Sequence, residues 1–330
     1  MDKKEKNLQI SIVVPFYNEE DNIEELYEQL TRVLKGLGAS YELVFIDDGS
    51  TDRSHDILLK VFESDKTVKV IRLRKNFGQT AALQAGFDHA GGDIIISMDG
   101  DLQHDPADIP KLLTPMDEGF DIVSGWRKER KDHFLLRRFP SWVANRIMRL
   151  LSGVKIHDFG TTFKAYRREV LEGIRLYGEL HRFIPALISR TGVKITEVPI
   201  KNVVRQKGKS NYGLARVRRV LFDLMTVKFI ISFIDRPLQF FGLIGLIFGG
   251  IGFTIALILT MGFYLFGWSI QDNLGNLILG VFLMILGLQF IMTGLLAEVI
   301  SRIYFTTHEM RIYSVAELKT HQPSGNDEGS

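Results

Sequence analysis

The sequence contains no cysteine among its 330 residues. This absence excludes disulfide frameworks, thiolate zinc sites, iron–sulfur clusters and a cysteine nucleophile, and it favours a reducing compartment. Net charge is also low, because 41 lysines and arginines stand against 39 aspartates and glutamates and leave +2. So small an excess argues against a basic nucleic-acid-binding surface, and we expect no nucleic acid partner. Any bound metal must be held by oxygen or imidazole ligands.

Three common functional motifs are missing as well. There is no G-x-G-x-x-G, and Gly208-Lys209-Ser210 lacks the upstream glycine of a Walker loop because Val203 stands at that position. There is no H-E-x-x-H, and the 8 histidines show no metal-ligand spacing, so we interpret His104 and His157 as structural or surface residues. These absences disfavour dinucleotide oxidoreductases, P-loop nucleotide hydrolases and zinc hydrolases.

Charged residues are absent from two long apolar stretches near the C-terminus. Residues 237–271 contain none, and after Asp272 a second uncharged stretch covers 273–297 and ends at Glu298. Each is long enough to cross a hydrocarbon core of about 30 Å as a helix, whereas buried helices of soluble domains seldom exceed about 14 apolar residues. The pattern predicts two transmembrane helices within residues 237–298, at about 240–267 and 274–297.

Flanking charge predicts the orientation of this hairpin. The basic residues that precede it are Lys201, Arg205, Lys207, Lys209, Arg216, Arg218, Arg219, Lys228 and Arg236, whereas the connecting loop carries only Asp272. By the positive-inside rule we expect a multi-pass membrane protein with the N-terminal domain and both termini in the cytoplasm. The spans contain no ionisable group, which disfavours transport.

Small residues recur within the two predicted spans. Gly245 and Gly249 lie four apart, and Gly280, Gly287 and Gly294 lie at seven-residue spacing. Such spacing lets helix backbones approach closely, within the hairpin or between subunits, so we expect a homo-oligomer. The competing explanation is that glycine is simply common in membrane helices.

Short β-rich runs alternate with helical patterns before residue 127, which predicts an α/β fold with a mostly parallel, Rossmann-like sheet. The expected strands are Ile10–Pro15, Glu42–Asp47, Val68–Leu73, Asp93–Asp99 and Asp121–Trp126, and the expected helices include Asn22–Lys35 and Asp52–Phe62. In such sheets ligands bind beyond the carboxyl ends of the strands. We assign residues 1–212 to this domain.

The remaining segments flank the hairpin. Residues 213–236 alternate polar and apolar side chains at helical spacing and predict an amphipathic helix in the membrane interface. Residues 299–330 are expected to form a cytoplasmic juxtamembrane segment and a tail, polar from Lys319 onward, that is disordered.

Acidic residues gather where three of the predicted strands end. The first strand runs into Glu19, the second into Asp47 and Asp48, and the fourth into Asp99 and Asp101. Gly100 between the last two permits a turn that brings both carboxylates toward one hard cation, Mg²⁺ or Mn²⁺ held together with a diphosphate. An isolated Asp-x-Asp is usually a solvated turn, but three acidic strand ends in register favour a site.

Here the chain resembles a known family. P-x-Y-N-E from Pro15, D-D-G-S-T-D from Asp47 and D-G-D-L-Q-H-x-P from Asp99 are similar to the inverting GT-A glycosyltransferases of family 2, in the dolichol-phosphate mannose synthase branch. The resemblance continues through the V-S-G-W-R, F-K-A-Y-R-R and R-Q-K-G-K-S segments that begin at Val123, Phe163 and Arg205. Two C-terminal membrane helices are similar to those of bacterial polyprenyl-phosphate glucosyltransferases and aminoarabinose transferases.

The resemblance implies a set of donor-binding residues. It places Pro15, Tyr17, Glu19 and Asp48 against the base and ribose of a sugar nucleotide, and Asp99, Gly100, Asp101 and Gln103 at the metal and diphosphate, with Asp101 the more direct metal ligand. Arg205, Lys209 and Ser210 would close over the diphosphate and stabilise the leaving group. The same basic loop could instead attract anionic lipid, and both roles are compatible.

The resemblance also implies a polyprenyl phosphate acceptor at the membrane surface. Its phosphate oxygen would attack the anomeric carbon in line with the departing nucleoside diphosphate and invert the configuration. Because a phosphate monoester with a second pKa of about 6 is largely ionised near neutrality, a strong base is not required. Asp158 is the candidate base or acceptor-orienting group, or alternatively the cap of a turn, and Arg127, Arg137 and Arg138 are candidates for the acceptor phosphate.

We therefore expect transfer of one hexose, with glucose from UDP-glucose as the leading donor and GDP-mannose or a UDP-linked aminopentose as alternatives. A processive polysaccharide synthase is disfavoured, because Gly125, Ser141 and Gly267 precede the 3 tryptophans and no Q-x-x-R-W motif is formed. A non-catalytic, membrane-tethered scaffold that binds sugar nucleotides is the other alternative, which the intact acidic strand ends disfavour.

Overall fold

A computed structural model describes residues 10–128, 145–146, 148–150, 152–176, 178, 180–189, 192–201, 203, 237–306 and 312–321. The chain forms two compact units. One comprises residues 1–227 together with 311–330, and the other comprises residues 228–310. The C-terminal segment thus belongs to the same unit as the N-terminal domain.

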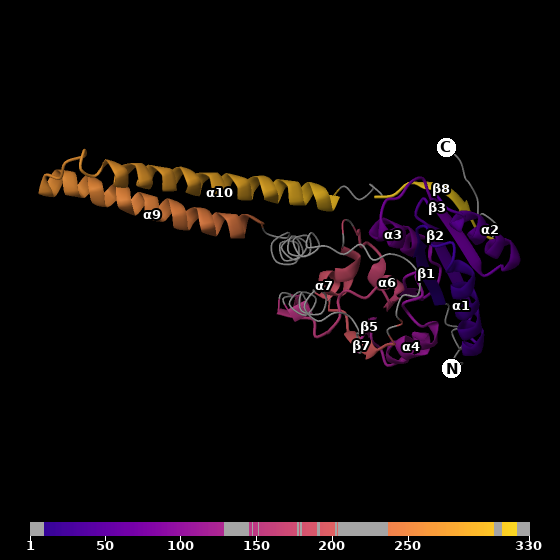
Figure 1. The fold of residues 1–330 in the computed structure, drawn as a ribbon. Helices are drawn as coiled ribbons and strands as arrows, with labels where there is room; N and C mark the ends of the chain where they lie inside the picture. The colour runs from indigo at the N-terminus through magenta and orange to yellow at the C-terminus, as the bar shows by residue number, and fades with distance from the viewer. Residues whose placement is uncertain are drawn as a thin grey trace. The chain divides into compact units, whose positions relative to one another are not determined.

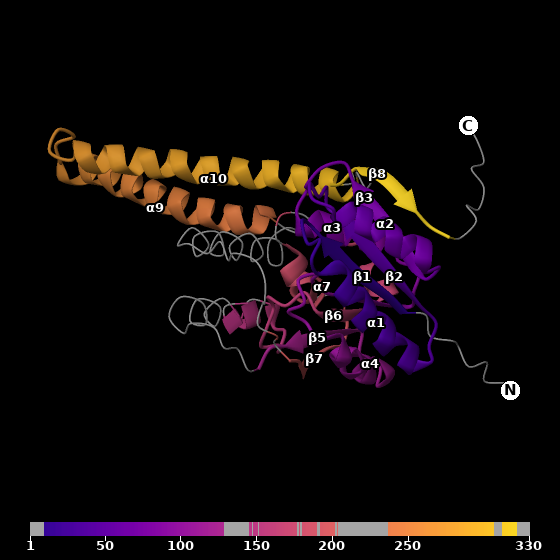
Figure 2. The same ribbon diagram turned by 45° about the vertical axis from the view of Figure 1, so that its right-hand side comes forward.

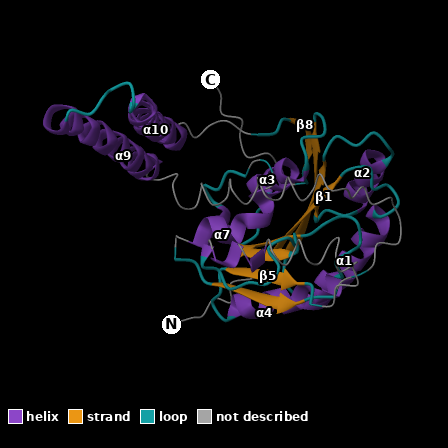
Figure 3. Cartoon of the chain, turned by 60° about the vertical axis from the view of Figure 1, so that its left-hand side comes forward, coloured by secondary structure: helices purple, strands orange, loops and turns teal. Residues whose placement is uncertain are grey.

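The first unit is built on one eight-stranded sheet (Figure 3) with the order β7-β5-β6-β4-β1-β2-β3-β8. Its strands are β1 (Ile10–Phe16), β2 (Tyr41–Asp47), β3 (Val68–Leu73), β4 (Ile94–Ser97), β5 (Ile122–Trp126), β6 (Lys164–Arg167), β7 (Ile195–Pro199) and β8 (Val315–Lys319). Strands β4, β1, β2 and β3 are mutually parallel, as are β5 and β7, whereas β6 and β8 pair antiparallel with their neighbours. The predicted α/β fold with a mostly parallel sheet is confirmed.

Helices cover both faces of the sheet (Figure 1). On one face α1 (Ile23–Leu37), α2 (Ser54–Ser64) and α4 (Ile109–Asp117) share a continuous apolar core with alternate residues of the strands. On the other face α3 (Gln79–His89) packs so closely that a Cβ at Gly86 would lie 2.3 Å from the Val13 side chain. The shorter elements are η1 (Pro106–Asp108), α6 (Arg168–Leu171), η3 (Leu180–Phe183) and α7 (Ile184–Ile188).

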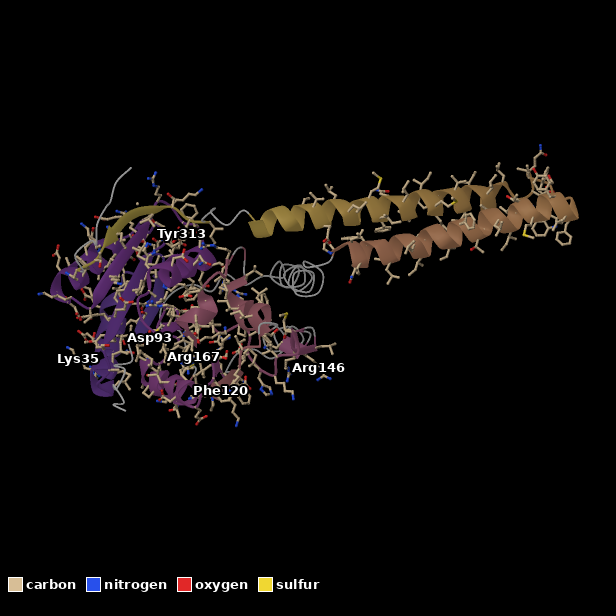
Figure 4. All side chains as sticks on the ribbon, turned by 180° about the vertical axis from the view of Figure 1, so that it is seen from behind. Lys35, Asp93, Phe120, Arg146, Arg167 and Tyr313 are labelled. Atoms are coloured by element: carbon tan, nitrogen blue, oxygen red, sulfur yellow. The ribbon has the colours of Figure 1, made fainter. Side chains whose placement is uncertain are left out.

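The segment that follows the hairpin adds the last strand to this sheet. Strand β8 pairs antiparallel with β3, which places Leu318 opposite Ile71. Tyr313, labelled in Figure 4, donates a 2.8 Å hydrogen bond to Asp88 on α3, and the His321 ring stacks 3.9 Å from that of Phe62. Sequence reasoning foresaw no strand here, and residues 322–330 lie outside the described residues. β8 covers what would otherwise be an exposed sheet edge.

The second unit is a helical hairpin in which α9 (Pro237–Phe266) and α10 (Leu274–Thr306) lie side by side (Figure 2). Both helices are long and apolar enough to cross a membrane, and only 11 % and 17 % of their most apolar windows are buried. Core helices of a soluble domain would be mostly buried, so the hairpin indicates membrane association. Helix α10 continues to Thr306, beyond the predicted end at residue 297.

Glycines form the seam between the two helices. A Cβ at Gly245 would lie 2.6 Å from the carbonyl oxygen of Gly287, and one at Gly252 would lie 2.5 Å from that of Gly280. Gly294 faces Leu238 and Phe241 in the same way. The glycines at seven-residue spacing therefore pack α10 against α9 within one chain. The expected homo-oligomer remains a prediction, and its subunits would have to meet through a different surface of the hairpin.

Replacing Gly252 by leucine should disrupt this hairpin. The new side chain would strike the backbone of α10, and overpacking of this kind costs about 1–3 kcal/mol or more. We expect a lower midpoint of thermal unfolding in detergent and less protein recovered from membranes. Gly250→Leu is the matched control, because no described atom lies within 4 Å of its Cβ position. If Gly250→Leu were equally damaging, that face would be packed against a second copy.

Candidate active site

The loop after β2 is fastened to the loop after β3. The Asp48 carboxylate accepts hydrogen bonds from the backbone N–H groups of Phe77 (2.8 Å) and Gly78 (2.9 Å). Gly49 has φ +69°, and a Cβ there would lie 2.4 Å from the Lys75 carbonyl carbon, so only glycine fits. Burial raises the pKa of Asp48. Asp48, predicted to contact the nucleotide, thus also fixes the backbone that leads into α3.

The end of β1 is joined to the same loop. Asn18 adopts a left-handed conformation, with φ 53°, and its side-chain oxygen accepts a 2.8 Å hydrogen bond from the Thr51 N–H. The Glu19 N–H donates to the Ser54 hydroxyl at 3.0 Å. Tyr17 projects with 45 % of its surface exposed. The structure therefore brings together the first two strand ends as predicted and leaves an aromatic ring exposed there.

The third acidic strand end is a tight turn. A Cβ at Gly100 would lie 2.6 Å from the Phe16 ring, and Leu102 is held at φ 59°, which is rare for a branched residue. The Gln103 amide donates to Asp101 Oδ2 at 2.5 Å, and the Gln103 N–H donates to Asp101 Oδ1 at 3.2 Å. The turn thereby positions the Asp101 carboxylate and the Gln103 side chain as one unit.

Asp99 is oriented by two neighbours. Gln79, the first residue of α3, donates from its amide to Asp99 Oδ1 at 2.6 Å, and the buried His104 accepts a 3.4 Å hydrogen bond from the Asp99 N–H on Nδ1. Burial lowers the pKa of His104, which keeps the ring neutral near pH 7. Burial alone would raise the pKa of Asp99, but positive charge around it, including that of Arg127, holds it below its usual value. His104 is therefore buried against Asp99 and not on the surface, and its structural role remains a prediction.

The chemistry of this turn suits a hard divalent cation. Its carboxylates and the Gln103 amide oxygen are all oxygen donors, which Mg²⁺ and Mn²⁺ prefer. Within the part of the chain that the structure describes, no group of three or more histidines and carboxylates comes together to hold a metal. A cation that takes one or two protein carboxylates and completes its shell with diphosphate and water fits this donor set.

Arg127 and Asp158 form an ion pair at this end of the sheet. Arg127 follows β5 and donates from Nε to Asp158 Oδ2 at 2.7 Å and from Nη2 to Oδ1 at 3.1 Å. Oδ1 also accepts a 3.1 Å hydrogen bond from the Gly160 N–H, and only 4 % of Asp158 is exposed. Asp158 therefore caps its own turn and orients Arg127 at the same time.

Several predicted site residues lie outside the described residues. These are Arg137, Arg138, Arg205, Lys209 and Ser210, and the amphipathic helix at 213–236 lies outside them too. Val203, the last described residue before this basic loop, donates from its N–H to the Gln103 carbonyl at 3.1 Å. The roles of the five predicted site residues outside the described part of the chain remain predictions.

Sequence reasoning missed Gln79 and the fully buried Lys164. Gln79 lies beyond the carboxyl end of β3, just as the other site residues lie beyond the carboxyl ends of their own strands. Its position after a parallel strand was therefore the signal that could have identified it. Lys164 lies within a short strand whose sequence, Lys-Ala-Tyr-Arg, shows no clear alternation. It belongs to the F-K-A-Y-R-R segment of the family resemblance, which assigned it no role, and its burial in the folded chain singles it out.

Comparison with known proteins agrees with this geometry. The profile of the family described as "Glycosyl transferase family 2" matches residues 11–175. A curated relative, dodecaprenyl-phosphate galacturonate synthase of Rhizobium johnstonii, is 38 % identical over 95 % of this chain and 94 % of its own length. Glucosyl-3-phosphoglycerate synthase of Mycobacterium tuberculosis, solved with Mn²⁺, UDP and phosphoglyceric acid, superposes with a TM-score of 0.51 at 23 % identity, covering 67 % of this chain and 78 % of that one.

Proposed function

The chain belongs to glycosyl transferase family 2, and from that premise we propose that it transfers one sugar from a nucleoside diphosphate to a polyprenyl phosphate. The observation that carries the proposal is the joining of three strand ends at one edge of the GT-A sheet. There the Asp48 loop, the Asp99 to Gln103 turn and the Arg127–Asp158 pair follow β2, β4 and β5. Ligands of such sheets bind at this edge.

The donor side of the reaction follows from the first two of these features. Tyr17 and the loop at Asp48 would receive the nucleotide, and Asp99, Asp101 and Gln103 would hold a divalent cation with the diphosphate. When bound, that cation neutralises charge that develops on the leaving diphosphate. Arg205, Lys209 and Ser210 would add charge-assisted hydrogen bonds to the same phosphates.

The acceptor side follows from the Arg127–Asp158 pair. A phosphate monoester is recognised well by a guanidinium held in a fixed orientation, and Asp158 supplies that orientation. The acceptor oxygen is already ionised near neutral pH, so positioning can supply much of the rate enhancement. Arg137 and Arg138 are further candidates for this phosphate.

The donor sugar is the finer part of the proposal. UDP-glucose is the donor that the sequence resemblance favours, and the name of the Rhizobium relative adds a galacturonate donor. The Mycobacterium neighbour, solved with UDP, is consistent with a uridine nucleotide and Mn²⁺. GDP-mannose and a UDP-linked aminopentose stay as alternatives.

The membrane hairpin completes the proposal. An acceptor with a polyprenyl chain lies in the bilayer, so its phosphate is accessible to an enzyme that is held at the membrane surface. We propose that α9 and α10 provide this attachment and that the sheet-containing unit lies on the cytoplasmic side, as the basic residues before α9 favour.

A direct assay tests the function. Purified protein in detergent is incubated with polyprenyl phosphate, Mg²⁺ or Mn²⁺, and radiolabelled UDP-glucose, UDP-galacturonate or GDP-mannose in parallel, and label is counted after extraction into organic solvent. We expect lipid-linked label from one donor, lost on chelation and restored by added metal. Nucleotide binding without turnover of any donor would instead favour the scaffold alternative.

A further inference from the structure

Lys164 is a fully buried lysine in the middle of the sheet. It is the first residue of β6 and pairs in register with Ser97 of β4 on one side and Ser124 of β5 on the other. Strand β4 runs on to Asp99 and β5 to Arg127. Lysine is almost never fully buried without partners, so a role for this one has to be sought in its contacts.

The partners of Lys164 belong to the turn that carries Asp158. Its Nζ donates a 3.2 Å hydrogen bond to the Phe159 carbonyl oxygen and a second, shorter one to the Thr161 carbonyl oxygen. Both carbonyls flank Gly160, whose N–H is bound by the Asp158 carboxylate. The Lys164 ammonium group and the Asp158 carboxylate thus bind backbone groups of the same turn.

The charges around Lys164 are those of the active site. Burial lowers its pKa to about 7. Of the charged groups that act on it, Asp158 and Asp99 raise the pKa, and Arg127 and Arg182 lower it. Holding a lysine where burial disfavours its charge is a cost to the fold, and perturbed groups of this kind gather at functional sites. An apolar side chain of similar length would fill the space without that cost, but it would leave two carbonyls unpaired.

We propose that Lys164 is a positioning residue for the acceptor site: by binding the Phe159 and Thr161 carbonyls it fixes the turn from which Asp158 orients Arg127. The inference rests on the proposed function only in naming the acceptor. Donor binding depends on the ends of β1, β2 and β4. The backbone of Lys164 pairs with β4, but the hydrogen bonds of its side chain go to the Phe159 and Thr161 carbonyls. The predicted defect is therefore specific to one substrate.

Two variants and a control test the proposal in the full-length protein. Lys164→Met removes both hydrogen bonds, whereas Lys164→Gln keeps an N–H donor without the charge. Because small misplacement of a positioning group can cost about 100-fold, we expect Lys164→Met to lower kcat/KM for polyprenyl phosphate by about that factor, with donor KM and UDP affinity unchanged. Lys164→Gln should recover part of the loss. Tyr166→Phe, equally buried two residues further along β6, should behave as the wild type.

Hydrogen exchange gives a readout that does not depend on turnover. We expect amides of residues 158–163 to exchange faster in Lys164→Met than in the wild type or in Tyr166→Phe. Equal exchange, or a loss shared by donor and acceptor parameters, would overturn the proposal, and Lys164→Gln decides the question if Lys164→Met does not fold. Failure of the wild type to label any lipid would instead reject the proposed function, while the exchange result would still test the position of the turn.

Discussion

Asp101→Asn should abolish sugar transfer, lowering kcat by about a thousandfold, the upper range for loss of a group that stabilises transition-state charge. The substitution removes one negative charge from the turn that we assign to the metal and diphosphate. It also turns an acceptor of the Gln103 amide into a group that can point its own N–H₂ there. Both changes weaken the hold on the cation that the leaving diphosphate needs.

The measurement is initial rate against metal concentration, with UDP binding followed in parallel. We expect the variant to stay folded and membrane-bound and to need far more metal for any residual rate. Asp93→Asn is the matched control, because Asp93 immediately precedes the opposite end of the same strand, β4, and is exposed. If Asp101→Asn retained a large part of the wild-type rate, this turn would have to be removed from the proposed metal site.

Asp158→Asn should reduce transfer by about a hundredfold, and by the same factor at every pH from about 6 to 9. In the structure both carboxylate oxygens are already bound to Arg127, and one also to the Gly160 N–H. We therefore expect this carboxylate to act by orienting the guanidinium. An amide keeps one acceptor but loses the charge-assisted second bond, so Arg127 should be held less firmly.

The pH profile separates this role from that of a general base. If Asp158 removed a proton, the defect of Asp158→Asn would shrink as rising pH ionised the acceptor unaided. A double-mutant cycle adds a second criterion. Because the two residues act as one pair, Arg127→Ala combined with Asp158→Asn should cost little more than the worse single variant. Additive losses would show that the residues work separately.

The sequence predicted which strand ends meet at one edge of the sheet, because parallel strands impose a simple rule. Glu19, Asp48, Asp99 and Asp101 follow strands whose apolar runs are readable, and parallel strands must bring their carboxyl ends to one edge. The turn-cap interpretation of Asp158 is confirmed by the hydrogen bond from the Gly160 N–H, whereas its role as a base or acceptor-orienting group remains a prediction. Whether Asp48 contacts the nucleotide remains a prediction.

Other elements were harder to locate in the sequence. Helix α3 was expected only as one of the helical segments between strands. It is buried on nearly every side from Thr80 to Phe87, so no amphipathic period marks its bounds, and Gln79 was overlooked. Strands β6 and β8 are four and five residues long and rich in charge. Their pairing is decided by the neighbours they meet in the folded sheet, which lie far away in the sequence.

The position of β8 bears on the order in which this protein can be made. A ribosome finishes β3 early, but the strand that covers it is synthesised only after both apolar helices. Until then the edge of β3 stays open, and open edges invite pairing with other chains. On the topology proposed above, a chain whose C-terminal segment was left on the other side of the bilayer could not close that edge. Completion of the sheet would then require that both helices have crossed the membrane and returned the C-terminal segment to the side of the sheet-containing unit.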